Sequence, residues 1–186
     1  MPAPPSVSQR PAAAAGALWQ MAWASLPADL LCRLAAEAAA LEIGCGAGLS
    51  CLALAQAFAG LTVTGHDRDA RAVARARALG RAAGLADRLK FEVNDSQKLP
   101  RAAFDLITAV ALRDDRDLGQ CFNRIRNALR PQGSCLLLAA WPPDHGRPAG
   151  PLRDDDAALA KAARNAGFSR FVPVPSPDAD LFELRR

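Results

Sequence analysis

The sequence predicts an α/β fold built on a mostly parallel, seven-stranded sheet with helices on both faces. Short apolar runs alternate with helix-length segments, and the last two runs are separated by Pro175-Ser176-Pro177. The alternation is typical of βαβ units, and the proline-rich break favours a closing antiparallel hairpin. The expected strands are Ala40–Ile43, Leu61–Gly65, Leu89–Val93, Phe104–Ala111, Ser134–Ala140, Arg170–Val174 and Asp180–Leu184.

The helices between these strands are expected at Gly48–Ala59, Asp69–Ala83, Leu118–Leu129 and Asp154–Ala166. Upstream, apolar residues recur at helical spacing from Gly16 to about Ala40. Pro27 should divide this stretch into two helices, because proline lacks an amide donor. Residues 1–15 are rich in proline and alanine, so we expect them to be poorly ordered. The predicted organisation is a disordered segment 1–15, N-terminal helices at 16–40 and a single domain at 41–186.

The composition is that of one soluble globular domain. The chain has 186 residues, of which 51% are apolar and 23% are charged, and this length is enough for a buried core. The formal net charge of +4 permits an anionic partner without requiring one. No run of about 18 apolar residues is present, so no membrane span is expected. The first residues lack the pattern of a secretory signal, and an organelle transit peptide is the less favoured alternative.

The cysteines favour a reduced, cytoplasmic protein. None forms a Cys-x-x-Cys pair and no Cys/His cluster has zinc spacing, so we expect no metal site. Their number is odd, which also favours thiols over disulfides. The five are Cys32, Cys45, Cys51, Cys121 and Cys135.

A glycine-rich turn follows the first expected strand. Residues 44–48 read Gly-Cys-Gly-Ala-Gly, and Glu42 stands two positions before them. Glycine adopts backbone angles closed to other residues and lets a ligand approach the chain closely. The helix that follows presents its amide donors at the same place. A dinucleotide fingerprint would place its third glycine at position 49, where Leu49 stands.

Further segments follow this turn in a characteristic order. The second strand leads into Asp67, whose carboxylate can accept hydrogen bonds from both hydroxyls of a ribose. Residues 93–100 read Val-Asn-Asp-Ser-Gln-Lys-Leu-Pro, and Phe104–Ile107 and Arg124–Gly133 come after them. With the glycine turn, these segments resemble the motifs of class I S-adenosylmethionine-dependent methyltransferases over about Leu41–Leu138.

The resemblance implies a Rossmann-like sheet, S-adenosylmethionine as cofactor, and methyl transfer to a small-molecule acceptor. It implies that Glu42 holds the methionine amino group, Asp67 the ribose and Asp95 the adenine edge. Asp67 could instead cap the helix expected near Asp69, and Asp95 could close a turn. The residues that the resemblance places at the cofactor are Glu42, Gly44, Cys45, Gly46, Gly48, Asp67, Arg68, Asn94, Asp95, Ser96 and Val110.

Two departures from the family pattern concern the turn before the fifth strand and the segment after the fourth. Gln132 stands where the family often has glycine. Residues 111–115 read Ala-Leu-Arg-Asp-Asp, where many relatives carry a histidine pair or an aromatic residue. Neither change affects the cofactor assignments, but the second leaves the substrate open.

The candidate catalytic residue is His145, which follows the fifth strand at the edge where open α/β sheets bind ligands. An imidazole near its ordinary pKa suits proton removal. The alternative, which we favour, is an exposed loop histidine. His66 is expected to pack beside the cofactor instead of acting as a base.

Two other features have a functional and a structural interpretation. Trp19, Met21 and Trp23 could form an apolar lid over a substrate, or belong to an amphipathic helix packed on the sheet. The basic stripe is a set of arginines on the helix expected after the second strand, and nearby acidic residues favour a solvated face over an RNA surface. The stripe comprises Arg71, Arg75, Arg77 and Arg81.

The sequence thus favours a methyltransferase acting on a small molecule, with no membrane partner, nucleic acid disfavoured and the oligomeric state open. An RNA or protein methyltransferase of the same fold is one alternative. A cofactor-binding protein without catalysis is another. A nicotinamide-dependent oxidoreductase is disfavoured by the glycine spacing and by the absence of tyrosine.

Overall fold

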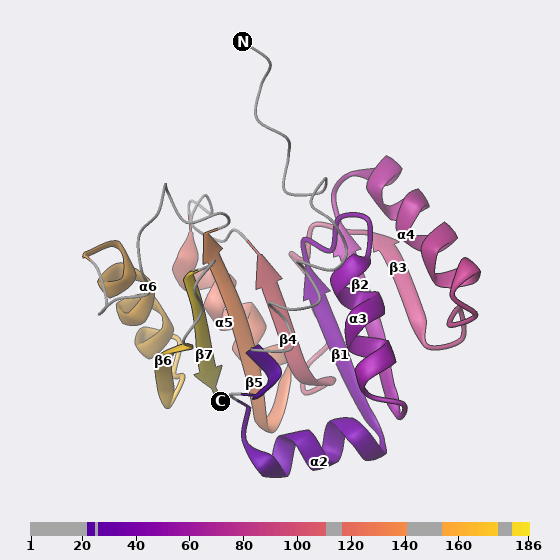
Figure 1. Ribbon diagram of the computed structural model, residues 1–186. Coiled ribbons are helices and arrows are strands. Elements are labelled where there is room, and N and C mark those ends of the chain that lie inside the picture. Colours follow the sequence, from indigo (N-terminus) through magenta and orange to yellow (C-terminus); the bar gives the residue numbers. More distant parts are fainter. Residues whose placement is uncertain (1–21, 25, 111–116, 141–153, 175–179) are drawn as a thin grey trace.

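A seven-stranded sheet in the order β3-β2-β1-β4-β5-β7-β6 forms the centre of the molecule (Figure 1). The computed structural model describes residues 22–24, 26–110, 117–140, 154–174 and 180–186. The strands are β1 (Ala38–Ile43), β2 (Leu61–Asp67), β3 (Leu89–Val93), β4 (Phe104–Val110), β5 (Leu129–Ala140), β6 (Arg170–Val174) and β7 (Asp180–Arg185).

Strands β1 to β5 pair in parallel, and β7 runs antiparallel to both β5 and β6. The predicted fold, with its C-terminal antiparallel hairpin, is confirmed. The chain passes from β3 on one side of β1 to β4 on the other, so the strand order reverses between β1 and β4. Ligands of open α/β sheets bind at such a reversal, beyond the carboxyl ends of the strands.

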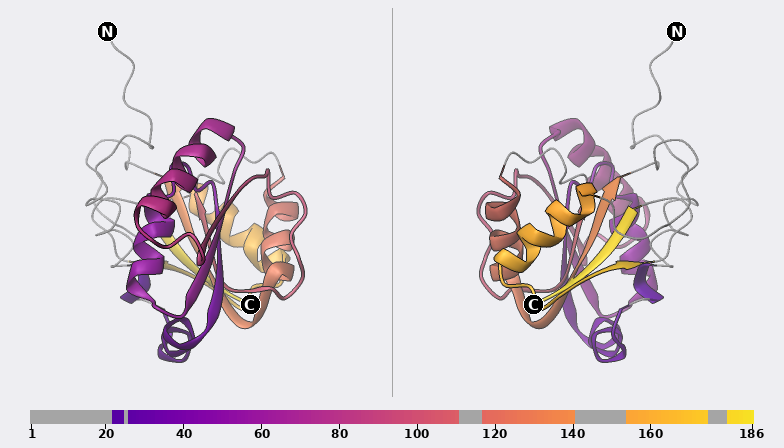
Figure 2. Two further views of the ribbon diagram at one scale, coloured as in Figure 1. Left: turned by 90° about the vertical axis from the view of Figure 1, so that its right-hand side faces the viewer. Right: turned by 90° about the vertical axis from the view of Figure 1, so that its left-hand side faces the viewer.

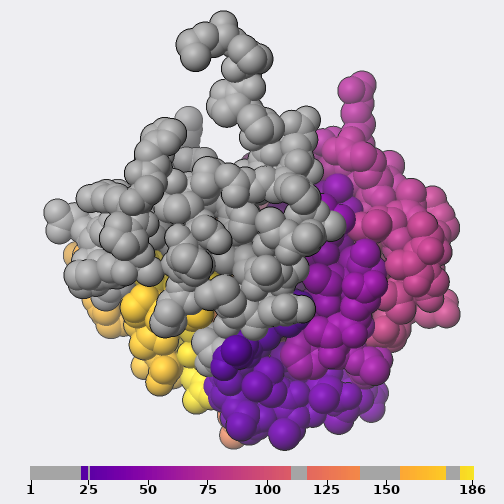
Figure 3. All heavy atoms as spheres, in the orientation of Figure 1, coloured from indigo at the N-terminus to yellow at the C-terminus, as the bar shows by residue number. Residues whose placement is uncertain are grey.

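Helices cover both faces of the sheet (Figure 2). On one face lie α3 (Leu49–Ala57) and α4 (Ala70–Ala82), and on the other lie α5 (Leu118–Ala128) and α6 (Asp154–Asn165). Helix α2 (Ala28–Ala36) lies at the end of the sheet where β1 begins, below α3 in Figures 1 and 3. Each face therefore has its own apolar core, and the strands between them are buried on both sides.

The N-terminal helices end earlier than the sequence predicts. Residues 22–24 are helical and α2 stops at Ala36, but Ala38–Ala40 belong to β1 and pair with Leu61–Val63. The strand expected to begin at Ala40 begins at Ala38, so this boundary was wrong by two residues. Three alanines fit a helix as well as a buried strand by local preference, and the partner strand decides between them.

Strand β5 begins at Leu129, five residues before the expected Ser134. Leu129 pairs with Phe104 and Ser134 pairs with Leu106, so the register shifts across residues 130–133. Gln132 in this segment has a φ of 64°, the left-handed conformation in which glycine is favoured. This geometry explains why a glycine is common at the position that Gln132 occupies.

Asp105 attaches α2 to the sheet. Its buried carboxylate accepts hydrogen bonds from the amide of Ala39 at 3.0 Å and from Arg130 at 2.7 Å. Arg33 of α2 lies 4.0 Å from the same carboxylate and donates to the carbonyl of Gln132 at 3.0 Å. Arg33 thereby holds α2 to the start of β4 and to the turn at Gln132, and Ala22 and Trp23 belong to the apolar core on the α3 side of the sheet.

In the part of the chain that the structure describes, no helix is long and apolar enough to cross a membrane.

Candidate active site

The glycine turn between β1 and α3 has the backbone conformation that its sequence predicts. Gly44, Gly46 and Gly48 all have positive φ, at 79°, 53° and 82°. The amides of Gly44 and Cys45 both donate to the carbonyl of His66, at 2.9 and 3.0 Å. The turn therefore continues the β1–β2 ladder beyond the end of β1.

Gly46 and Gly48 need to be glycine for different reasons. A Cβ on Gly48 would lie 2.8 Å from the Phe91 ring and 2.9 Å from the Cβ of Ala76, so Gly48 permits close packing of the turn on α4 and β3. A Cβ on Gly46 would meet no atom within 4 Å. The open side of the turn is therefore at Gly46, where a ligand could approach the backbone.

Asp67 at the end of β2 connects to this open side. Its Oδ2 accepts a hydrogen bond of 2.8 Å from the amide of Gly46, and its Oδ1 accepts one of 2.9 Å from the amide of Asp69. The N-cap of α4 is Asp69, which accepts from the amide of Arg71. The capping role that was the alternative for Asp67 therefore belongs to Asp69.

The segment after β3 completes the same edge of the sheet. The amide of Asn94 donates to the carbonyl of Asp67 at 2.9 Å. Asn94 Oδ1 accepts from the amide of Ser96, and Asp95 Oδ1 accepts from the amide of Gln97 at 3.0 Å. Asp95 thus closes a turn, which was the alternative interpretation of this residue. Its carboxylate is exposed, and its second oxygen can accept a further hydrogen bond.

The His66 side chain packs against this segment. Its ring Nδ1 lies 3.1 Å from Ser96 Oγ, and its Nε2 lies 3.5 Å from Glu92. Ser96 has a φ of 58°, which is unusual for a residue with a side chain. Burial lowers the pKa of His66, although the charge of Glu92 opposes this shift. His66 is thus a buried side chain packed against Ser96 and Glu92.

Glu42 is 2% exposed, close to the start of α3. One carboxylate oxygen accepts from Ser50 Oγ, and the other accepts from Cys51 Sγ at 2.7 Å. Burial raises the pKa of Glu42 to about 7, and the charge of Asp67 adds to the increase, while the hydrogen bonds from Cys51 and Ser50 oppose it. Burial likewise raises the pKa of Cys51, which keeps the thiol protonated as a donor.

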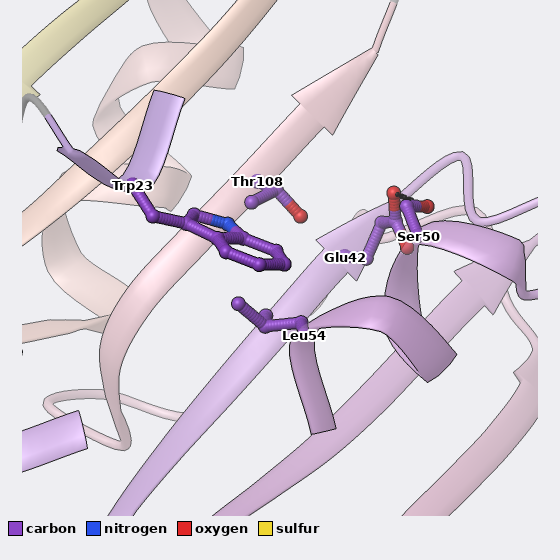
Figure 4. Close-up of a pocket in the computed structure, with 5 residues that line it drawn as sticks. All are labelled: Trp23, Glu42, Ser50, Leu54 and Thr108. Atoms are coloured by element: carbon purple, nitrogen blue, oxygen red, sulfur yellow. Dashed lines mark hydrogen bonds between the residues drawn. The ribbon is translucent and has the colours of Figure 1, made fainter. Parts of the chain in front are cut away.

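Glu42 also borders a narrow cavity at the reversal point of the sheet (Figure 4). Thr108 of β4 stands opposite Glu42 in the β1–β4 register. Figure 4 shows the indole of Trp23 between Thr108 and Leu54, extending toward Glu42 and Ser50. The space between these five side chains is too narrow to hold a water molecule.

A family model described as a methyltransferase domain matches residues 40–133, about half of the chain. This chain belongs to that methyltransferase family. The match confirms the resemblance drawn from the sequence, and it spans the segments from β1 to the turn before Ser134.

Solved structures are similar to this protein over more of the chain. A putative O-methyltransferase from Nostoc punctiforme is 20% identical with a TM-score of 0.69, and the similarity covers 94% of this chain and 56% of that one. Phosphoethanolamine N-methyltransferase 2 from Haemonchus contortus, solved with S-adenosyl-L-methionine, is 22% identical with a TM-score of 0.61 over 77% and 36%. The [4+2]-cyclase SpnF is 25% identical with a TM-score of 0.63 over 81% and 60%. The chain thus spans about 36–60% of the length of these proteins.

For this methyltransferase-family chain, the structure gathers most of the predicted site residues at one edge. Gly46 and Asn94 are both hydrogen-bonded to Asp67, and Glu42 is hydrogen-bonded to Ser50 and Cys51 of the helix that follows the glycine turn. Arg68 is exposed just beyond β2, and Val110 ends β4. His145, Trp19 and Met21 lie outside the described residues, as do residues 111–115. Within the described part, no three His, Cys, Asp or Glu side chains are placed to hold a metal ion.

Sequence reasoning missed Ser50, Cys51 and Thr108. Ser50 and Cys51 belong to the first turn of α3, and their partner Glu42 lies on the strand before the turn. Thr108 had a signal in the sequence, because it is a lone hydroxyl in the apolar run of β4 after Asp105. A polar side chain within a strand buried on both faces requires a partner, and this requirement often marks a site.

Proposed function

We propose that this chain binds S-adenosylmethionine at the carboxyl edge of β1, β2 and β3 and transfers its methyl group to a small-molecule acceptor. The observation that carries the proposal is the open side of the glycine turn at Gly46, held by Asp67 at the reversal point of the sheet. An open backbone turn with a carboxylate beside it suits a ligand that carries ribose hydroxyls.

Each part of the cofactor has a candidate partner in this proposal. Glu42 accepts hydrogen bonds from the methionine ammonium, and Asp67 accepts them from the ribose. Asp95 lies at the adenine edge, where Asn94 and Ser96 form the turn that presents it. The remaining predicted contacts come from Gly44, Cys45, Gly46, Gly48, Arg68 and Val110.

The protein's part in the chemistry is positioning. The cofactor, when bound, supplies a methyl group on a sulfonium, which is already an activated leaving system. The chain has to hold the acceptor in line with that methyl group and exclude water. A base is required only for a weakly nucleophilic acceptor such as a hydroxyl, and His145 stays our candidate for that role.

A small molecule is the acceptor class that the observations favour over RNA. The basic stripe on α4 is not wholly available to a polyanion, because Arg77 donates to the carbonyl of Phe91 at 2.9 Å. Asp69 stands beside Arg71 at the start of the same helix.

The thiol form of all five cysteines, together with their spacing, supports the proposed cytoplasmic location.

The test is calorimetric titration of the folded protein with S-adenosylmethionine and S-adenosylhomocysteine, beside the Asp67→Ala variant. We expect micromolar binding, or about −8 kcal/mol, and its loss in the variant. Arg71→Ala, on the exposed side of α4, is the matched control and should bind both ligands normally. Absence of binding to wild-type protein with an intact thermal transition would overturn the proposal.

The alternative of a binding protein without catalysis is separated by a second step. Once cofactor binding is established, the protein is incubated with methyl-labelled S-adenosylmethionine and a panel of small-molecule acceptors. Label in an acceptor, lost in Asp67→Ala, supports the enzyme. Tight binding with no transfer across the panel and to RNA or protein acceptors favours the non-catalytic alternative.

A further inference from the structure

His66 connects two segments of the candidate site that are far apart in the sequence. Its backbone carbonyl accepts hydrogen bonds from the amides of Gly44 and Cys45, at 2.9 and 3.0 Å. Its ring Nδ1 lies 3.1 Å from Oγ of Ser96, which follows thirty positions later. One residue of β2 therefore holds the glycine turn through its main chain and the turn after β3 through its side chain.

The contact between His66 and Ser96 lies in the interior of the protein. Both residues are only 5% exposed, so water has little access to either polar atom. A buried hydroxyl or ring nitrogen that loses its partner bears the cost of its lost hydration without compensation. This cost opposes any movement that separates Ser96 from His66.

Ser96 has a backbone conformation that requires support from its surroundings. Its φ is 58°, in the left-handed region that residues with a side chain rarely adopt. Within the turn, the amide of Ser96 donates to Asn94 Oδ1 at 2.8 Å, and the amide of Gln97 donates to Asp95 Oδ1 at 3.0 Å. The His66 ring adds an anchor from a neighbouring strand, directly at the residue with the unusual φ.

We propose that His66 and Ser96 are positioning residues, which place the carboxylate of Asp95 so that it selects ligands that carry the 6-amino group of adenine. The inference rests on the proposed function, in which Asp95 lies at the adenine edge. Neither positioning residue has to touch the ligand. They act through the backbone of the turn that carries Asp95.

Asp95 needs this support because its side chain is exposed. An exposed carboxylate can turn toward water at little cost, so it distinguishes two bases only where the surrounding residues hold it in place. The backbone is held on both sides of Asp95. The amide of Asn94 donates to the carbonyl of Asp67 at 2.9 Å, and Ser96 is anchored on His66. The first of these bonds is between main-chain atoms, so the second is the one that a side-chain substitution can remove.

The experiment compares two ligands that differ in one amino group. S-adenosylhomocysteine and its analogue with unsubstituted purine in place of adenine are titrated into wild-type protein, Ser96→Ala and His66→Leu. Wild-type protein should prefer the adenine ligand by about tenfold, the effect of a hydrogen bond to a charged group. Both variants should lose most of this preference, because the turn that carries Asp95 is no longer anchored.

A matched pair of variants separates positioning from general packing. In His66→Asn the side-chain amide lies near the place of the imidazole Nδ1, so it can still bond to Ser96, and the preference for adenine should be largely restored. In His66→Gln the amide reaches the place of Nε2, on the side of Glu92, and the preference should stay low. Thr64→Val removes a hydroxyl from the same face of β2 and should behave as wild type.

Three outcomes would contradict the inference in different ways. Retention of the preference in both Ser96→Ala and His66→Leu would overturn it, even if both ligands bound more weakly. Equal affinity of wild-type protein for the two ligands would also overturn it, while the proposed cofactor binding stood. If folded wild-type protein bound neither ligand, the proposed function would fail and the inference with it.

Hydrogen exchange tests the anchor in the protein without ligand. In Ser96→Ala the amide of Gln97, which donates to Asp95, should exchange about tenfold faster, because the turn opens more often. The amide of Asn94 donates to the carbonyl of Asp67 and should keep its protection as the internal control. An unchanged rate at Gln97 would contradict the anchoring role, whichever ligands the protein binds.

Discussion

The amide of Gly46 donates a hydrogen bond of 2.8 Å to Oδ2 of Asp67. This bond connects the turn after β1 with the end of β2, so the two segments assigned to different parts of the cofactor are already joined in the protein alone. The same carboxylate fixes the amide of Asp69 through its other oxygen at 2.9 Å. Asp67 therefore fixes the backbone at Gly46 and Asp69 and also places a carboxylate at the candidate site.

We expect Asp67→Ala to free the Gly46 amide, because its acceptor is removed. Hydrogen exchange at Gly46 should quicken by about tenfold or more, the effect of losing a charge-assisted bond. The amide of Gly44, which donates to the carbonyl of His66, should keep its protection and serves as the internal control. Equal acceleration at both amides would mean that the whole turn had opened.

Gly46→Ala and Gly48→Ala should separate binding from stability. Both positions have positive φ, so each alanine costs about 1–2 kcal/mol in backbone strain. At Gly48 the added Cβ also meets Phe91 and Ala76, and the total cost should reach about 2–5 kcal/mol. At Gly46 the Cβ enters open space, so the protein should stay folded and lose cofactor affinity. Urea denaturation and calorimetry measure the two effects, and a reversed order would refute this account.

Glu42 should make the protein less stable as pH rises. Its pKa is raised in the folded state to about 7 from 4.5, so the folded protein holds a proton that the unfolded chain has released. The free energy of unfolding therefore falls between about pH 4.5 and 7, by about 3 kcal/mol from this group. Glu42→Gln should lack this slope. Subtracting the two profiles removes the contribution of His66, which both proteins share.

Cofactor binding should release a proton below about pH 7. An ammonium beside Glu42 favours its ionised form, so binding to protein that carries a protonated Glu42 must expel the proton. The enthalpy of S-adenosylhomocysteine binding at pH 6 should then depend on the ionisation enthalpy of the buffer. The dependence should fade at pH 8 and be absent in Glu42→Gln. Buffer-independent heats at pH 6 would argue against contact between Glu42 and the ammonium.

Gln132→Gly should stabilise the protein without affecting ligand binding. Gln132 has a φ of 64°, a conformation that costs a residue with a side chain about 1–2 kcal/mol. Glycine avoids this cost, but part of the stabilisation is lost because glycine gives up more conformational entropy on folding. The net increase in the free energy of unfolding should be about 0.5–1 kcal/mol. The hydrogen bond from Arg33 goes to the carbonyl of Gln132 and survives the change. A stability loss would show that the glutamine side chain has a role of its own.

The sequence predicted the strands and helices whose conformation depends on residues close by in the chain. Strands β3 and β6 begin and end where alternation and turn residues place them, and helices α3 to α6 deviate by at most two residues at either end. Local pattern could not assign Ala38, Ala39 or Leu129, because their state depends on the strands they pair with. Ser50 and Cys51 were missed as partners of Glu42 because their contact depends on how α3 packs against β1.

The pairing of β1 with β4 has a consequence for biosynthesis. Thr108 donates to the carbonyl of Leu41, sixty-seven positions earlier, and its strand supplies one wall of the cavity beside Glu42. While the chain emerges from the ribosome, β1 can pair with β2, but its other edge stays open until β4 has been made. An open edge in a central strand is prone to pair with other chains. The nascent protein therefore has an interval in which β1 and its glycine turn exist while one edge of β1 is unpaired, and the arrival of β4 ends that interval.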